Sequence, residues 1–304
     1  MEGIISLISQ LVPCIIAGFI LSKINPNISN KCAKILIDYG VPISLTGLLL
    51  KTGINVKLIY AALISSASII IFFSLLILIK PISHKLRKKE LQLGSVLGNS
   101  GYLGIPFAVA LLPIETLQIS LGYDLGAKLV CWTFAPSIIK NQNTFNLKTF
   151  FKEVFFSKAL LSVLLALIIE LSPFDNKINK LLWLPSKLII NFALITISMK
   201  IQYLLQIHSN NIFKYTKEIF LPITIKLIIF PFFIFLVCNL LNTSQGFMRA
   251  FILQAACPTA ISVFLISEAQ NNGDNYSAIL VFYSTIISLV TIPIWSFLLI
   301  NKSI

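Results

Sequence analysis

The residues best suited to forming a binding site lie in GNSGYLGIP, residues 98–106, inside an apolar stretch of spanning length. Three glycines, Pro106 and the polar pair Asn99 and Ser100 all weaken a continuous helix. Backbone groups freed by a break at membrane depth cannot face lipid, so they must be buried in protein or line a watery cavity. A simpler interpretation is that the glycines, Gly101 among them, permit close helix packing and Pro106 makes an ordinary kink.

A second apolar stretch is interrupted in the same way at AACPTAIS, residues 255–262. Its proline, Pro258, follows Pro106 by half of the 304-residue chain. In transporters, paired breaks of this kind place half-helix N-termini, with their partial positive charge, beside an anionic substrate. The pair therefore favours a binding site over ordinary packing.

Charged residues inside apolar stretches are the other candidates, because burying a charge in a membrane is costly. Asp124 and Lys128 have i, i+4 spacing, so they share a helix face and form either a structural ion pair or a proton or ion relay. Lys226 is explained equally well by snorkelling to the interface and by a role as substrate counter-charge. Glu268 lies near a helix end, where an interfacial position is favoured over coupling-ion binding.

The composition indicates an integral membrane protein. Hydrophobic residues make up 57% of the chain and charged residues 12%, whereas soluble domains carry about 25% charged residues. A helix needs about 20 apolar residues to span a bilayer, so this length allows about ten spans and no separate soluble domain. The apolar stretches fall near 4–21, 35–50, 58–79, 92–112, 117–139, 157–172, 181–201, 218–241, 247–269 and 276–300.

Lys and Arg residues in the loops predict the orientation. Loops on one side hold roughly twice as many as those on the other, and cytoplasmic loops carry the excess, so both termini are predicted on the extracytoplasmic side of the cell membrane. An odd number of spans in each half predicts two inverted five-helix repeats. The predicted domains are residues 1–139, a cytoplasmic linker at 140–156, and residues 157–304.

The sequence lacks the motifs of other functional classes. The net charge of +13 comes from loops rather than from a basic face with aromatics, which argues against nucleic-acid binding. Five cysteines form no CxxC pair, and the two histidines form no HExxH motif, so no metal site is expected. Nucleophile-elbow and phosphate-loop motifs are missing too, so we expect neither an enzyme nor a cofactor.

Three segments resemble the auxin efflux carrier family of permeases, in its compact bacterial form: GNSGYLGIP at 98–106, AACPTAISVFLISEAQNNGD at 255–274 and STIISLVTIPIW at 284–295. The resemblance implies broken fourth and ninth helices that cross near the midplane and form the substrate site. It places Asn99, Ser100, Gly101 and Pro106 at the first crossing segment and Cys257, Pro258 and Thr259 at the second.

Two positions depart from the family pattern. Cys257 stands where methionine is common, and Leu194, the counterpart of Pro42, stands where a second proline is common. The first departure bears on substrate fit and the second on whether the seventh helix is kinked.

We therefore expect an all-α secondary transporter that moves a small organic anion, auxin-like or dicarboxylate, by alternating access. The alternatives are a cation-coupled carrier of another solute in a related inverted-repeat fold, and a non-transporting membrane receptor or assembly partner. The expected partners are the anion and the lipid bilayer, with a homodimer as one option for the oligomeric state.

Overall fold

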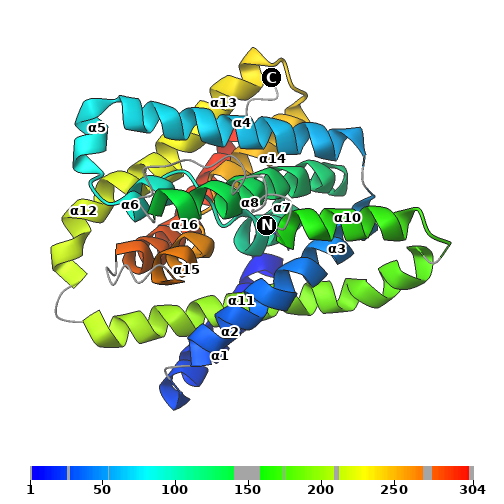
Figure 1. Cartoon of the computed structure of the whole chain (residues 1–304), viewed down its shortest axis with the longest axis horizontal. Coiled ribbons are helices and arrows are strands. Elements are labelled where there is room, and N and C mark those ends of the chain that lie inside the picture. The colour runs from blue at the N-terminus through cyan, green and yellow to red at the C-terminus, as the bar shows by residue number, and fades with distance from the viewer. Residues whose placement is uncertain are drawn as a thin grey trace. The chain divides into compact units, whose positions relative to one another are not determined.

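The computed structural model of the protein describes residues 2–25, 28–53, 55–139, 158–173, 175–208, 212–269 and 276–300. These residues form helices joined by turns, and they include one isolated β-bridge but no β-strand (Figure 1). The predicted all-α fold class is confirmed for this part of the chain. The chain divides into two compact units, Met1–Ile59 with Phe145–Ile207 and Tyr60–Thr144 with His208–Ile304.

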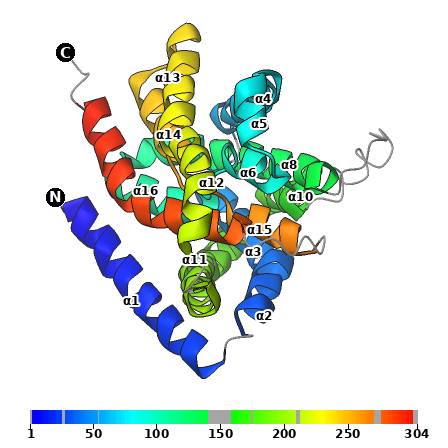
Figure 2. The ribbon, with the colours of Figure 1, turned by 90° about the vertical axis from the view of Figure 1, so that its left-hand side faces the viewer.

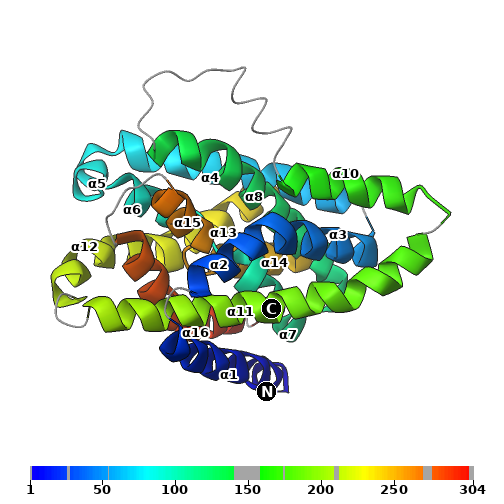
Figure 3. The same ribbon diagram turned by 60° about the horizontal axis from the view of Figure 1, so that its bottom comes forward.

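The first unit contains α1 (Glu2–Ile24), α2 (Ile28–Ile35), the π-helical turn η1 (Leu36–Gly40), α3 (Val41–Thr52), α10 (Lys158–Glu170) and α11 (Asp175–His208). Helix α3 packs against α10, where Thr46 Oγ1 donates a hydrogen bond to the Ser162 carbonyl at 3.2 Å. Ser186 Oγ of α11 donates to the Ile43 carbonyl of α3 at 3.3 Å. Figure 3 shows α11 as the long helix of this unit.

Helix α11 remains α-helical through Leu194, whereas the chain before Pro42 forms the π-helical turn η1. Leucine keeps the backbone N–H that proline lacks, so the i→i−4 hydrogen bonds continue at Leu194. The absence of proline at this position thus coincides with an uninterrupted seventh predicted helix.

The second unit contains α4 (Val56–Leu78, the unit boundary falling in its first turn), α5 (Lys80–Lys85), α6 (Lys89–Gly94), the π-helical turn η2 (Ser100–Gly104), α7 (Ile105–Leu111), the 3₁₀ turn η3 (Ile114–Thr116), α8 (Leu117–Ile139), α12 (Ile212–Thr224), the π-helical turn η4 (Ile225–Ile229), α13 (Phe230–Leu240), α14 (Gln245–Ala255), α15 (Ile261–Ala269) and α16 (Tyr276–Ile300). Ser65 Oγ of α4 donates to the Tyr123 carbonyl of α8 at 2.8 Å. The Tyr123 ring meets Phe251 of α14 edge-on at 5.0 Å. These contacts join α4, α8 and α14 in one apolar core.

Each of the three π-helical turns comes shortly before a proline: Pro42 after η1, Pro106 after η2 and Pro231 after η4. A proline ring clashes with the carbonyl four residues earlier and offers it no N–H. A turn widened to i→i+5 bonding accommodates this clash without ending the helix. Figure 2 shows the result in the second unit, where α12, η4 and α13 form one continuous rod.

Three helices in the described residues are long and apolar enough to cross a membrane, by length and composition: Val56–Leu78, Lys217–Leu240 and Tyr276–Leu299. Large apolar side chains are exposed along them, as at Leu63 and Phe232, which suits a lipid-facing surface. The predicted fourth and ninth stretches each contain two shorter helices separated by an unwound segment. The ten-span count and the inverted repeat stay predictions.

The two compact units do not coincide with the two predicted halves. Each unit takes one segment from the N-terminal half and one from the C-terminal half. The predicted linker at 140–156 lies outside the described residues. All of the candidate site residues belong to the second unit.

Candidate substrate site at a helix crossing

Two interrupted helices of the second unit meet where their backbone is unwound, between α6 and η2 and between α14 and α15. The N–H of Asn99 donates to the Pro258 carbonyl at 2.7 Å, and the N–H of Ala260 donates to the Leu97 carbonyl at 2.9 Å. These two bonds satisfy backbone groups that the breaks remove from the helices. The two predicted breaks are therefore one structure, a crossing.

Further contacts of Gly98 and Thr259 hold the crossing in place. Gly98 and Thr259 form the isolated antiparallel bridge at its centre. Thr259 Oγ1 donates to the Gly94 carbonyl at the end of α6 at 2.8 Å, and the Thr259 N–H donates to Ser284 Oγ of α16 at 3.1 Å. Because both of its donors are engaged within the protein, Thr259 fixes the position of the two segments.

Four helix ends meet at this crossing. Helices α6 and α14 end there, and the helical stretches that begin with η2 and with α15 start there. Helix C-termini carry a partial negative charge and N-termini a partial positive charge. The crossing therefore offers binding positions for both anionic and cationic groups within one small volume.

Glycines 98, 101 and 104 of the first segment each leave room for a polar side chain. A β-carbon added at these positions would meet, in that order, Lys226 Nζ at 3.0 Å, the Asp124 carboxylate at 3.0 Å from Oδ1, and Gln254 Oε1, with which it would overlap. The glycines thus permit close approach of charged and amide groups, and this is more specific than the general close packing considered from the sequence.

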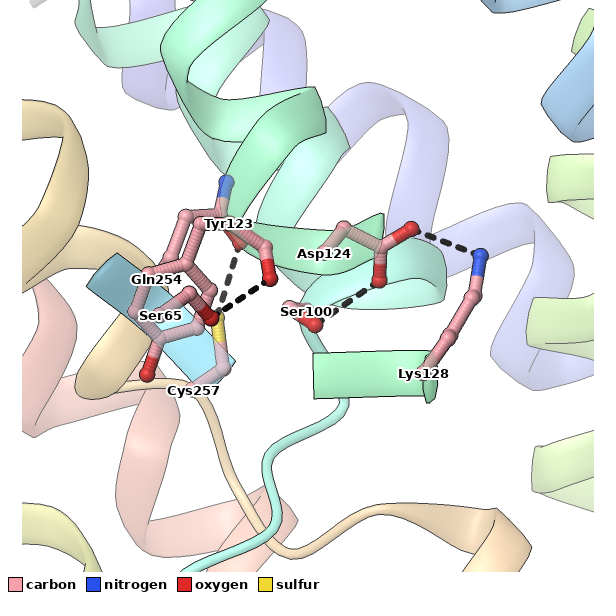
Figure 4. A network of polar contacts seen from close by, with 7 residues as sticks. All are labelled: Ser65, Ser100, Tyr123, Asp124, Lys128, Gln254 and Cys257. Atoms are coloured by element: carbon pink, nitrogen blue, oxygen red, sulfur yellow. Dashed lines mark hydrogen bonds and ion pairs between the residues drawn. The ribbon is translucent and has the colours of Figure 1, made fainter. Parts of the chain in front are cut away.

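Asp124 and Lys128 of α8, which their spacing places on one helix face, form an ion pair. Lys128 Nζ donates to Asp124 Oδ2 at 2.6 Å, and Ser100 Oγ donates to the other carboxylate oxygen, Oδ1, at 2.8 Å (Figure 4). The Asp124 side chain is 3% exposed and that of Lys128 is 17% exposed. The first crossing segment is therefore tied to α8 through a buried carboxylate.

Three buried donors at the crossing have no hydrogen-bond partner among the described residues: Asn99 Nδ2, Tyr102 Oη and Gln254 Nε2. Buried polar groups in folded proteins are nearly always hydrogen-bonded, so a cluster of unpartnered donors calls for an explanation. A bound group with acceptor oxygens, such as a carboxylate, would supply the missing partners.

Cys257 and Pro106 are also buried beside the crossing. Cys257 Sγ lies 4.0 Å from Gln254 Oε1 and 3.4 Å from the Leu253 carbonyl, facing back along α14. Figure 4 shows Gln254 and Cys257 near the ring of Tyr123. Pro106 lies in the first turn of α7, directly after the π-helical turn η2.

The structure brings most of the predicted site residues together. The two crossing segments supply Asn99, Ser100, Gly101, Pro106, Cys257, Pro258 and Thr259, and α8 supplies Asp124 and Lys128. Glu268 lies in α15, but its side chain is outside the described part of the structure. Its suggested coupling role stays a prediction.

Sequence reasoning missed Gln254 and Tyr102. Gln254 is fully buried near the end of α14, immediately before the second break. A lone amide in an apolar stretch that leads into a break is a signal that could have identified it. Tyr102 lies inside the first motif, but nothing in its spacing distinguishes it from a core aromatic residue.

Two further charged residues are buried in the described part of this unit: Glu90, which the sequence did not single out, and Lys226, for which it left two explanations open. Glu90 is buried in α6, and Ser267 Oγ of α15 donates to its Oε1 at 3.4 Å. Lys226 is fully buried, and its Nζ donates to the Ala255 carbonyl at 2.6 Å. Snorkelling to the interface is therefore the wrong explanation of Lys226.

Comparison with known proteins adds one finding. Residues 188–304 match the model of the sodium bile acid symporter family. The matched part includes the second crossing segment but neither the first segment nor the Asp124–Lys128 pair. A search of curated proteins found no match.

This match supports membrane transport, but it does not support the auxin efflux carrier resemblance as such. The matched family is one of secondary membrane transporters, and the described helices include three of spanning length. The chain is therefore a membrane protein, helical throughout its described elements, whose C-terminal part matches a transporter family.

Proposed function

We propose that this protein is a secondary transporter of a small organic anion and that the helix crossing is its substrate site. The observation that carries the proposal is the set of buried, unpartnered donors at the crossing, Asn99 Nδ2, Tyr102 Oη and Gln254 Nε2, close to where two half-helices begin and two end. Donors beside positive helix ends favour an oxyanion. The nearby Asp124 carboxylate is neutralised by Lys128, so it does not oppose an anion.

In this proposal, the half-helix N-termini hold a carboxylate, while Asn99 and Gln254 donate hydrogen bonds to its oxygens. The auxin-like or dicarboxylate class comes from the motif resemblance. Alternating access would expose the site to the two sides of the membrane in turn. The proposal of an inverted repeat is supported by the paired helix interruptions at 98–106 and 255–262, which lie at corresponding places in the two halves of the chain.

A cation-coupled carrier of another solute is the second candidate, and the match to a sodium bile acid symporter family favours it. It would use the same crossing, with its negative helix ends as the cation position. A non-transporting receptor is the third, and solute flux separates it from the other two. A cell-membrane location with both termini outside, and a homodimer, are part of the proposal.

The experiment is transient current from the purified protein in liposomes, challenged with malonate, malate, succinate and indole-3-acetate. Asn99→Ala removes a donor to a charged group, so we expect half-saturation to require about tenfold more anion. Asn239→Ala is the matched control, because Asn239 is an exposed amide on α13. Silence for every anion from folded, inserted protein would refute organic-anion transport, and equal affinity in Asn99→Ala would remove Asn99 from the site.

A further inference from the structure

Lys226 is the one lysine at the crossing whose charge no carboxylate of the described residues neutralises within ion-pair distance. It lies in η4, inside the spanning helix Lys217–Leu240, and its side chain is fully buried. A buried ammonium needs compensating negative charge close by. The contacts of its Nζ show where that charge comes from.

The Nζ of Lys226 donates to the carbonyl of Ala255, the last residue of α14, at 2.6 Å. The carbonyls of a helix's last turn carry its partial negative charge. Nζ also lies 4.7 Å from the centroid of the Phe230 ring, whose face attracts cations. Gly98 leaves room for the ammonium, because a β-carbon there would lie 3.0 Å from Nζ.

The ammonium thus occupies a position suited to a metal cation. The carbonyl that Nζ contacts is that of Ala255, where the half-helix α14 ends at the crossing. In transporters with broken helices, unwound carbonyls and half-helix C-termini coordinate the coupling sodium ion or proton. A free cation could bind here only by displacing the ammonium, because two positive charges at one place repel each other.

We propose that the Lys226 ammonium is a tethered cation that takes the place of a coupling sodium ion at the crossing. The positive charge that stabilises the crossing is covalently attached to α12–η4–α13, so its presence does not depend on the sodium concentration. This inference rests on the proposed function and gives it a coupling property: anion transport that needs no sodium.

Sodium dependence of the wild-type protein is the first test. Transport of the anion found above and the thermal midpoint in detergent are measured in sodium chloride and in N-methylglucamine chloride at equal ionic strength. Replacing sodium should change the transport rate by no more than about twofold and should leave the thermal midpoint unchanged, because the tethered charge is retained. A loss of about tenfold on sodium removal, the size expected when a charged contact is lost, would overturn the proposal.

Two variants of Lys226 form the second test, with Lys217→Met as the control, because Lys217 is an exposed lysine at the start of the same spanning helix. Lys226→Met should reduce transport at least about tenfold, since the C-terminal end of α14 then lacks its cation. Lys226→Ser leaves a small polar side chain and vacates the space beside the Ala255 carbonyl, so sodium, but not the larger N-methylglucamine, should raise the thermal midpoint of this variant. Full transport by Lys226→Met, or no sodium response by Lys226→Ser, would count against a tethered cation.

The thermal measurements need no substrate, so the two proposals can fail separately. If no anion is carried, the transport proposal fails. The tethered cation is still supported if wild-type stability ignores sodium while that of Lys226→Ser responds to it. A sodium-stabilised wild type would overturn the tethered cation and leave organic-anion transport standing.

Discussion

The buried ion pair of α8 gives the sharpest prediction about how the site is held together. Asp124 accepts hydrogen bonds from Lys128 Nζ at 2.6 Å and from Ser100 Oγ at 2.8 Å. In Asp124→Asn, an amide can still accept from Ser100, but Lys128 loses its counter-charge. The variant therefore isolates the charge from the hydrogen bond.

The magnitude follows from the burial of the two side chains. Breaking a fully buried pair costs about 3 to 5 kcal/mol, but Lys128 keeps some access to water, so we expect about 2 kcal/mol. That cost corresponds to roughly 5 °C in the thermal midpoint of a domain of this size. The double variant Asp124→Asn/Lys128→Met removes both charges and should recover at least half of the loss.

The assay is the thermal midpoint by intrinsic tryptophan fluorescence, combined with anion current in liposomes. We expect the double variant to be stable yet to carry less than about a tenth of the wild-type current, since the pair contacts the first crossing segment. Wild-type current in the double variant would show that the pair is only structural. An unchanged midpoint in Asp124→Asn would refute the argument from burial itself.

Three further predictions concern single positions. Gly104→Ala places a methyl group against Gln254 Oε1 and should raise the half-saturating anion concentration several-fold, whereas Gly246→Ala, with its nearest contact at 3.4 Å, should not. Thr259→Val leaves the Gly94 carbonyl without its 2.8 Å hydrogen bond and should cost about 1 to 3 kcal/mol in thermal or denaturant unfolding; a neutral result would contradict a fixing role for Thr259. Burial raises the pKa of the Cys32 thiol above its ordinary value, so the maleimide labelling rate of a variant with Cys32 as its single cysteine should rise steadily from pH 7 to pH 9, and a plateau below pH 8 would contradict the direction of this shift.

The sequence was most informative where local chemistry decides the structure. Glycine and proline disrupt helical hydrogen bonding wherever they occur together, so both breaks could be located at 98–106 and 255–262. The i, i+4 spacing of Asp124 and Lys128 fixes their distance on any helix, so the pair was predictable too. The function of these groups was not, because spacing alone does not distinguish a relay from a structural pair.

Contacts between distant segments could not be read in the same way. Gln254 and Gly104 are neighbours only because the two breaks cross, and no periodicity in either segment encodes that. Lys226 illustrates a second limit. From its position in the spanning stretch, its long side chain could extend either to the membrane interface or into the protein. Only the fold shows that it turns inward to Ala255.

The bridge between Gly98 and Thr259 has a consequence for how such a site can diversify. The two bonds that flank it, Asn99 to Pro258 and Ala260 to Leu97, join main-chain atoms, which every residue type carries except for the N–H of proline. These two main-chain bonds do not depend on the side chains of Asn99, Ala260 and Leu97, whereas Thr259 and the nearby glycines are constrained by their own contacts. Because main-chain hydrogen bonds join the two segments, neighbouring side chains can change to recognise a different substrate while these bonds are kept.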